Sequence, residues 1–260
     1  GSNTVVNSYW DTQTSGRVTS NGGFGLTTAQ MKDPGSFNAW DFANVWGITQ
    51  GVTYPYLRWQ SGTPPPQQQQ LISGMLDVAV AGKTIYFAVN GTLLPYQTTT
   101  TTGGIYSIAL PYNSVPSSSA LLAYVGNDTV KGASVYLSSG GNISDLLLNS
   151  GTLIAMSGGG SMSNTTLGSA KGSLSSSDIP YSVSGTNLIL GSGFNFRVAN
   201  GTAYTLNGNI TTTNGSQVYN GPLTLSANAE LSSIGGAITT NAVVNASAYA
   251  LKISGDSGIA

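Results

Sequence analysis

Acidic side chains are the groups in this sequence that could cleave a bond in pairs, and glycoside hydrolysis is the reaction that such a pair performs. The two acids must lie about 5–9.5 Å apart, so acids gathered at one short spacing would indicate the site. The region after residue 138 has no such group, and Asp33-Pro34 in the first region is a turn signal. The acids considered are Asp11, Asp33, Asp41, Asp145, Asp178, Glu230 and Asp256. We expect solitary, turn-forming acids and no hydrolase or lyase activity.

Other catalytic groups are absent or lack their partners. The chain has no His and no Cys, which excludes imidazole bases, thiol nucleophiles and the usual zinc ligands. Its serines form no Ser-x-x-Lys pattern, and "SGGGSMS" lacks the Gly-Lys-Ser/Thr of a phosphate-binding loop. Asn127 and Asp128 lack the spacing of a calcium loop. An intramolecular amide between Lys83 or Lys131 and Asp77 is disfavoured, because both lysines lie beside Gly in turn-like settings. We expect no metal and no cofactor.

The charge balance excludes a polyanionic partner. Eight Lys and Arg against nine Asp and Glu give a net charge of −1, and 7% of the residues are charged. Nucleic-acid binding depends on clustered cations, and none are clustered here. The sequence has no apolar run of the length that spans a membrane as a helix. Gly1 and Ser2 read as a cloning remnant of an excised piece, which we expect to be a monomer.

The composition predicts an all-β protein with frequent turns. Thirteen Tyr, six Phe and many β-branched residues favour pleated strands, and 35 Gly favour turns. One helical turn is expected at "TTAQMKD", where Thr27 and Gln30 have the spacing of a capping box. Two short strands are expected around the Gln50-Gly51 turn.

Four regions follow from the pattern of apolar runs. Residues 1–60 are aromatic-rich, and residues 61–70, "SGTPPPQQQQ", are a Pro/Gln linker. Residues 71–137 contain short apolar runs between turns, including "KTIYFAVNG" with its alternation of two faces, and predict a small β-sandwich. Residues 138–260 have apolar pairs or triplets every ten residues or so, without a fixed period. This pattern predicts an open or irregular parallel β-solenoid.

The first region also resembles a known family. The blocks "NSYWD", "GLTTAQM", "AWDFANVW" and "YPYLRWQ" resemble the segment that closes an array of GLUG repeats in large filamentous-haemagglutinin-like exoproteins. "TTTNGSQVYNGPLTLSANAELSS" is similar to passenger repeats of the same class, and residues 71–137 look like an Ig-like or transthyretin-like sandwich. The resemblance implies a secreted, surface-exposed bacterial adhesin that is exported by two-partner secretion through an outer-membrane transporter. It carries no catalytic residues.

Aromatic residues of the first region have two expected roles. Trp10, Trp40, Phe42, Trp46 and Trp59 are expected to form a structural cluster that covers a solenoid end. On the segment "YPYLRW", Tyr54, Tyr56 and Arg58 fall on one face of a strand and form the candidate glycan-binding site, with Leu57 and Trp59 on the core face.

Three functions are weighed for the whole chain. The favoured one is attachment to a polysaccharide, a matrix polymer or a host-surface glycan. The alternatives are a carbohydrate-active enzyme of the β-helix type, which would need acids clustered on one face, and a spacer without a ligand.

Overall fold

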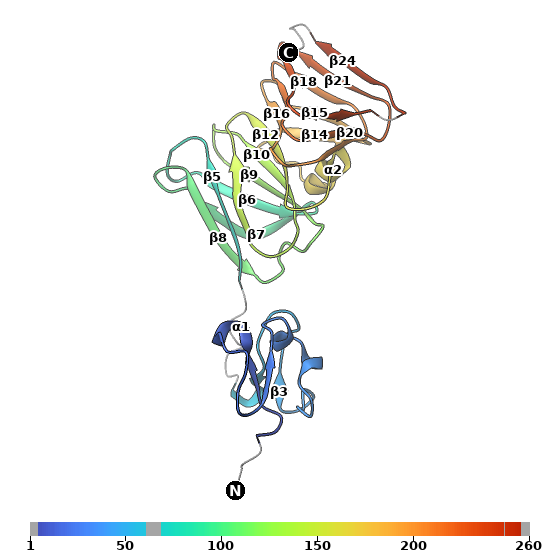
Figure 1. Ribbon diagram of the computed structural model, residues 1–260. Coiled ribbons are helices and arrows are strands. Elements are labelled where there is room, and N and C mark those ends of the chain that lie inside the picture. Colours follow the sequence, from blue (N-terminus) through green and yellow to red (C-terminus); the bar gives the residue numbers. More distant parts are fainter. Residues whose placement is uncertain (1–4, 61–68, 247, 256–260) are drawn as a thin grey trace. The chain divides into compact units, whose positions relative to one another are not determined.

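The computed structural model describes residues 5–60, 69–246 and 248–255, and the chain forms two compact units, Gly1–Gln69 and Gln70–Ala260. Strands make up 44% of the chain and helices 8%, which confirms the predicted all-β class (Figure 1). Most of the predicted linker, residues 61–68, lies outside the described residues. Gln69, within that predicted linker, is instead the first residue of strand β5 (Gln69–Leu76).

The first unit contains short elements joined by turns. Its strands are β1 (Tyr9–Asp11), which pairs in parallel with β2 (Phe24–Leu26), and β3 (Trp46–Gly47), which pairs antiparallel with β4 (Tyr56–Leu57). Its helical turns are α1 (Thr12–Ser15) and the 3₁₀ turns Gln30–Lys32, Pro34–Ser36 and Arg58–Gln60. The predicted capping box is present: the Thr27 amide donates to Oε1 of Gln30 at 2.9 Å, and the Gln30 amide donates to Oγ1 of Thr27 at 3.3 Å.

An aromatic cluster holds this unit together, but its membership differs from the prediction. Trp40 stacks on Trp46 with ring centroids 4.0 Å apart, and Phe37, which is buried, contacts Trp40. Trp59 is 76% exposed, so its predicted place on the core face is wrong. The cause is the 3₁₀ turn at Arg58–Gln60, which interrupts the two-residue period of a strand. The cluster consists of Tyr9, Phe24, Phe37, Trp40, Phe42 and Trp46.

Trp10 has a separate role from that cluster. Its ring lies over Gly25, where a Cβ atom would approach the indole to 3.0 Å. Its Nε1 donates to the carbonyl of Arg17 at 3.2 Å. Trp10 therefore fixes the loop between β1 and β2 and makes no ring contact with the cluster among the described residues.

One eight-stranded sheet runs through most of the second unit (Figure 1). Strand β10 pairs antiparallel with β9 on one side and in parallel with β12 on the other. The sheet therefore changes from antiparallel to parallel pairing at β10. In spatial order its strands are β22 (Ile238–Thr240), β19 (Gln217–Tyr219), β16 (Asn195–Val198), β12 (Thr152–Ser157), β10 (Ala133–Leu137), β9 (Ala120–Val125), β6 (Thr84–Val89) and β7 (Thr92–Thr99).

This sheet has a hydrophobic core on each face. In β9 every residue is buried: Leu122 and Tyr124 face one core, and Leu121 and Val125 face the other. A three-stranded sheet covers the second core, in the order β11 (Ile143–Leu148), β5, β8 (Ile105–Pro111). Strand β11 therefore belongs to the sandwich, although the prediction ends the sandwich at residue 137. Its buried Leu146 and Leu148 explain the difference, because both pack in the sandwich core.

The parallel part of the unit is a three-faced solenoid. Gln217 lies beside Phe196, and Ile238 beside Gln217, which is a spacing of 21 residues at each step. The predicted lack of a fixed period is wrong for these turns. The first turn hides the repeat, because an inserted helix and strand separate Met162 from Tyr204, its partner on the next turn. The remaining strands are β13 (Met162–Ser163), β17 (Tyr204–Leu206), β20 (Leu223–Leu225) and β23 (Val244–Asn245) on the second face, and β14 (Tyr181–Ser184), β15 (Asn187–Leu190), β18 (Ile210–Thr213), β21 (Ala229–Ile234) and β24 (Leu251–Gly255) on the third.

The inserted helix α2 (Asn164–Lys171) is absent from the prediction, which contains a single helical turn. Ser163 caps it, since its Oγ accepts from the Thr166 amide at 3.1 Å. Leu167 and Ala170, three positions apart, are fully buried in the core of the solenoid. The signal was in the sequence: a capping Ser, apolar residues at helical spacing and a Lys in the last turn.

Glycine and asparagine at the corners allow the turns to stack closely. At Gly221 a Cβ atom would lie 1.8 Å from the carbonyl oxygen of Thr202 on the preceding turn. Asn side chains bridge neighbouring turns, as where Oδ1 of Asn195 accepts from the Ser216 amide at 2.8 Å. The Gly and Asn content that follows residue 138 is therefore explained by stacking.

Candidate functional site

Asp11 is the centre of a polar network in the first unit. Its carboxylate accepts from Tyr54 Oη at 2.5 Å and from Thr28 Oγ1 at 2.7 Å. The amides of Gln13 and Thr14 also donate to it, at 2.8 and 3.0 Å. Burial raises the pKa of Asp11, but the hydrogen bonds from Tyr54, Thr14, Thr28 and Gln13 outweigh it, so that the pKa lies well below its ordinary value. The prediction of a solitary Asp11 missed this network, whose partner Tyr54 is distant in sequence.

The three candidate glycan residues all have structural partners. Tyr54 is 39% exposed, and its hydroxyl is committed to Asp11, which with burial raises its pKa. Tyr56 lies over Gly47, where a Cβ atom would approach its ring to 2.4 Å. Arg58 donates from Nε to the carbonyl of Trp46 at 2.9 Å and from Nη2 to that of Phe42 at 2.7 Å. These residues hold strands and loops of the first unit together.

Replacing Asp11 with asparagine is expected to destabilise the first unit at pH 7. The folded-state pKa is lowered, so the ionised carboxylate contributes stability at every pH above its unfolded value of about 3.9. The difference between the two proteins should shrink as the pH falls below that value, through the lowered folded pKa. All four Trp residues precede residue 60, so Trp fluorescence during thermal unfolding follows this unit alone.

Asp33→Asn is the matched control, because its carboxylate receives the Gly35 amide and Nε2 of Gln50 and has no buried hydroxyl partner. We expect a smaller loss of stability there. Equal transition temperatures for Asp11→Asn and the unaltered protein at pH 7 would contradict the role of the network.

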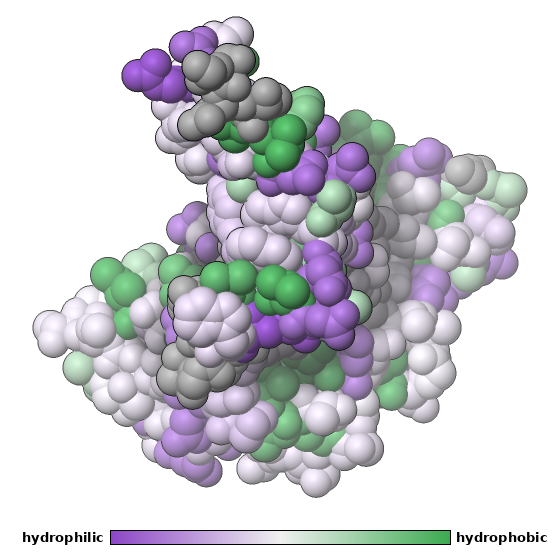
Figure 2. Space-filling model, turned by 90° about the horizontal axis from the view of Figure 1, so that it is seen from below, coloured by the Kyte–Doolittle hydropathy of each residue, from purple (hydrophilic) through white to green (hydrophobic). Residues whose placement is uncertain are grey.

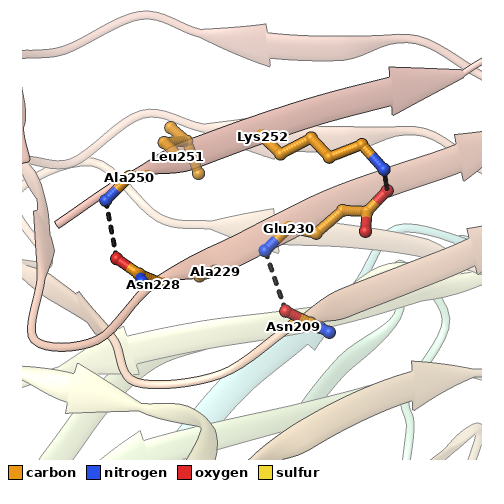
Figure 3. Close-up of a pocket in the computed structure, with 7 residues that line it drawn as sticks. All are labelled: Asn209, Asn228, Ala229, Glu230, Ala250, Leu251 and Lys252. Atoms are coloured by element: carbon orange, nitrogen blue, oxygen red, sulfur yellow. Dashed lines mark hydrogen bonds and ion pairs between the residues drawn. The ribbon is translucent and has the colours of Figure 1, made fainter.

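A polar groove lies on the third face of the solenoid, where strands β21 and β24 begin (Figure 3). Its volume is about 310 Å³, in the range of small-ligand sites. Glu230 and Lys252 project toward each other from these neighbouring strands, with Lys252 Nζ 3.0 Å from Glu230 Oε1. The lining residues are Asn209, Asn228, Ala229, Glu230, Ala250, Leu251 and Lys252.

Glu230 is ionised and only partly committed. Ser254 Oγ donates to its Oε1 at 2.6 Å, and this bond, with those from Lys252, lowers the pKa of Glu230. Both the Ser254 and the Lys252 contacts go to Oε1. Oε2 accepts no hydrogen bond from the residues that the structure describes, and it can receive a ligand's hydroxyl.

Two further ion pairs tie loops together. Lys83 contacts Asp128 at 2.8 Å, and Lys131 contacts Asp178, whose other oxygen accepts from the Asn127 amide at 3.0 Å. Asp77 accepts from the Ser150 amide at 2.8 Å and contacts neither lysine within the described ranges. These contacts join the β9–β10 loop to the segment that follows α2.

Comparison with known proteins gives no relative from which a function could be transferred. No family model, curated protein or solved structure matches the chain. Within residues 5–60, 69–246 and 248–255, no group of His, Cys, Asp or Glu is placed to hold a metal ion. None of the helices in those ranges combines the length and apolar character needed to cross a membrane. The geometry of the polar groove and of the solenoid faces is therefore the basis for function.

Proposed function

We propose that this chain is a non-catalytic segment of a large secreted bacterial surface adhesin, in which the solenoid extends the protein and its outer faces attach to a glycan or another surface polymer. The observation that carries the proposal is the stack of 21-residue turns. Each turn adds a layer of strands to three faces, so that side chains of one kind repeat along the axis.

The outer faces suit contact by hydrogen bonds. On the second face, Thr205, Thr224 and Asn245 lie in register on successive strands and do not point into the core. On the third face, Thr211, Ser232 and Ser254 do the same. Figure 2 agrees with this character, because the surface in that view consists mostly of residues of intermediate hydropathy with separate apolar patches. A face of hydroxyl and amide groups matches a polymer rich in hydroxyls more closely than a charged one.

The state of the acids supports a function without catalysis. The general acid of a glycosidase has a raised pKa. Here every acid whose pKa is shifted is shifted downward, namely Asp11, Asp41, Asp128, Asp178 and Glu230. An acid held in its ionised form does not protonate a leaving group. The alternative of a β-helix enzyme is therefore disfavoured.

Retention on coated surfaces tests the proposal. The full chain is applied to surfaces coated with neutral polysaccharide, acidic polysaccharide, mucin-type glycoprotein or fibrous matrix protein. We expect saturable retention on at least one, with no release of reducing sugar. Absence of retention on all four would leave the spacer function, and sugar release would indicate an enzyme.

A further inference from the structure

The charges in the polar groove are not required by the fold around them. Asn187, Asn209, Glu230 and Lys252 occupy the same position on four successive turns. Oδ1 of Asn187 accepts from the Asn209 amide at 3.0 Å, and Oδ1 of Asn209 accepts from the Glu230 amide at 2.8 Å. These asparagines join turn to turn without charge.

Glu230 and Lys252 interrupt that asparagine column. The next backbone amide in the groove, that of Ala250, is already capped by Oδ1 of Asn228 at 2.9 Å. The Lys252 side chain is 70% exposed and that of Glu230 is 32% exposed. Exposed ion pairs contribute about 0–1 kcal/mol to stability. In a chain with 7% charged residues, an exposed pair that stacking does not need is explained better by a ligand.

The groove offers the groups that recognise a sugar ring. Oε2 of Glu230 accepts hydrogen bonds, and the ammonium of Lys252 donates them. Ala229, Ala250 and Leu251 supply apolar surface beside these groups, which suits the C–H face of a pyranose. One carboxylate and one ammonium cancel, so the groove favours neither a polyanion nor a polycation.

The neighbouring column extends the site along the axis of the solenoid. Thr211, Ser232 and Ser254 lie in register two residues along the same strands, on the same outer face as Glu230 and Lys252. Successive strands lie about 4.8 Å apart, so hydroxyl groups repeat at that interval. A linear chain of sugars can contact both columns.

We infer that the groove formed by Asn209, Asn228, Glu230, Leu251 and Lys252 binds a neutral polysaccharide through vicinal hydroxyl groups of its pyranose rings. This inference rests on the proposed attachment function and assigns the site and the class of ligand. Glu230 accepts from one hydroxyl, Lys252 donates to its neighbour, and the ring lies against Ala229, Ala250 and Leu251.

Titration of the full chain with neutral hexasaccharides tests the site. Cellohexaose, laminarihexaose and mannohexaose are added to the ¹⁵N-labelled protein, with an oligogalacturonate as the acidic comparison. We expect amide shifts at Ala229, Glu230 and Ala250 to Lys252 with at least one neutral sugar. Glu230→Gln turns the uncommitted acceptor into a donor, and Lys252→Met removes the ammonium. Each should weaken binding about tenfold, as expected for one lost hydrogen bond to a charged group.

Lys171→Met on α2 and Asp145→Asn on β11 are the matched controls, since they make the same chemical changes outside the groove. They should bind as the unaltered protein does, and all four variants should keep its melting temperature. Unchanged affinity in both groove variants, shifts confined to other strands, tighter binding of the oligogalacturonate, or no binding of any neutral sugar would overturn the inference. Retention on coated surfaces in any of these cases would leave the attachment function standing with a different site.

Discussion

Replacing Phe196 with alanine is expected to destabilise the Gln70–Ala260 unit by about 3–5 kcal/mol, the cost of removing a buried Phe side chain from a core. Phe196 is fully buried, and its ring meets those of Tyr204 and Tyr219 edge-on, with centroids 5.7 and 5.8 Å apart. Chemical denaturation followed by far-UV circular dichroism measures the change. Because one sheet runs from the solenoid through β10 and β9 into the sandwich, the sandwich strands should lose protection from hydrogen exchange in the same variant.

The control for this variant is Ile189→Ala, which removes an apolar side chain from the outer face of β15, where it is 46% exposed. It should change stability by no more than about 0.5 kcal/mol. The Trp fluorescence transition should stay in place in both variants, since no described strand of one unit pairs with a strand of the other. Two separate transitions within the Gln70–Ala260 unit, with the sandwich unaffected by Phe196→Ala, would contradict the shared sheet.

Replacing Gly221 with alanine is expected to cost about 3 kcal/mol, at the upper end for overpacking. The added Cβ would lie 1.8 Å from the carbonyl oxygen of Thr202, and this neighbour is backbone of the preceding turn, so the turns themselves must move apart. The loss is measured by chemical denaturation, as for Phe196→Ala.

Gly159→Ala provides the contrast. Gly159 also has no left-handed backbone, but the nearest atom to an added Cβ is that of Ser139 at 3.6 Å, an ordinary contact. Its stability should stay within about 1 kcal/mol of the unaltered protein, or rise slightly, because alanine restricts the unfolded chain. Equal effects at the two glycines would show that close stacking does not explain the glycines of the solenoid.

Local patterns were sufficient to predict the strands and the all-β class. The alternation in "KTIYFAVNG" corresponds to β6, and the capping box at Thr27 and Gln30 forms as expected. Fully buried β9, "ALLAYV", has no alternation to read, because both of its faces pack against a core. The two-core sheet therefore depends on pairings between distant segments, which local pattern does not encode.

The candidate sites needed contacts that sequence spacing does not give. Asp11 and Tyr54 meet through folding of the whole first unit, and a turn-forming Asp looks the same in sequence. The strand period failed at Trp59, where the chain turns into a 3₁₀ helix. Glu230 and Lys252 are 22 residues apart, and they became neighbours only once the register of β21 and β24 was known.

Light scattering of a soluble neutral polysaccharide, with and without the full chain, tests the central claim most directly. That claim is that the stacked turns attach to a polymer without altering it. We predict a saturable rise in the mass of the complex, while the polymer recovered after prolonged incubation keeps its original molar mass. A polymer mass that falls with time would show catalysis, and the absence of a complex with any neutral polysaccharide would equally contradict the account.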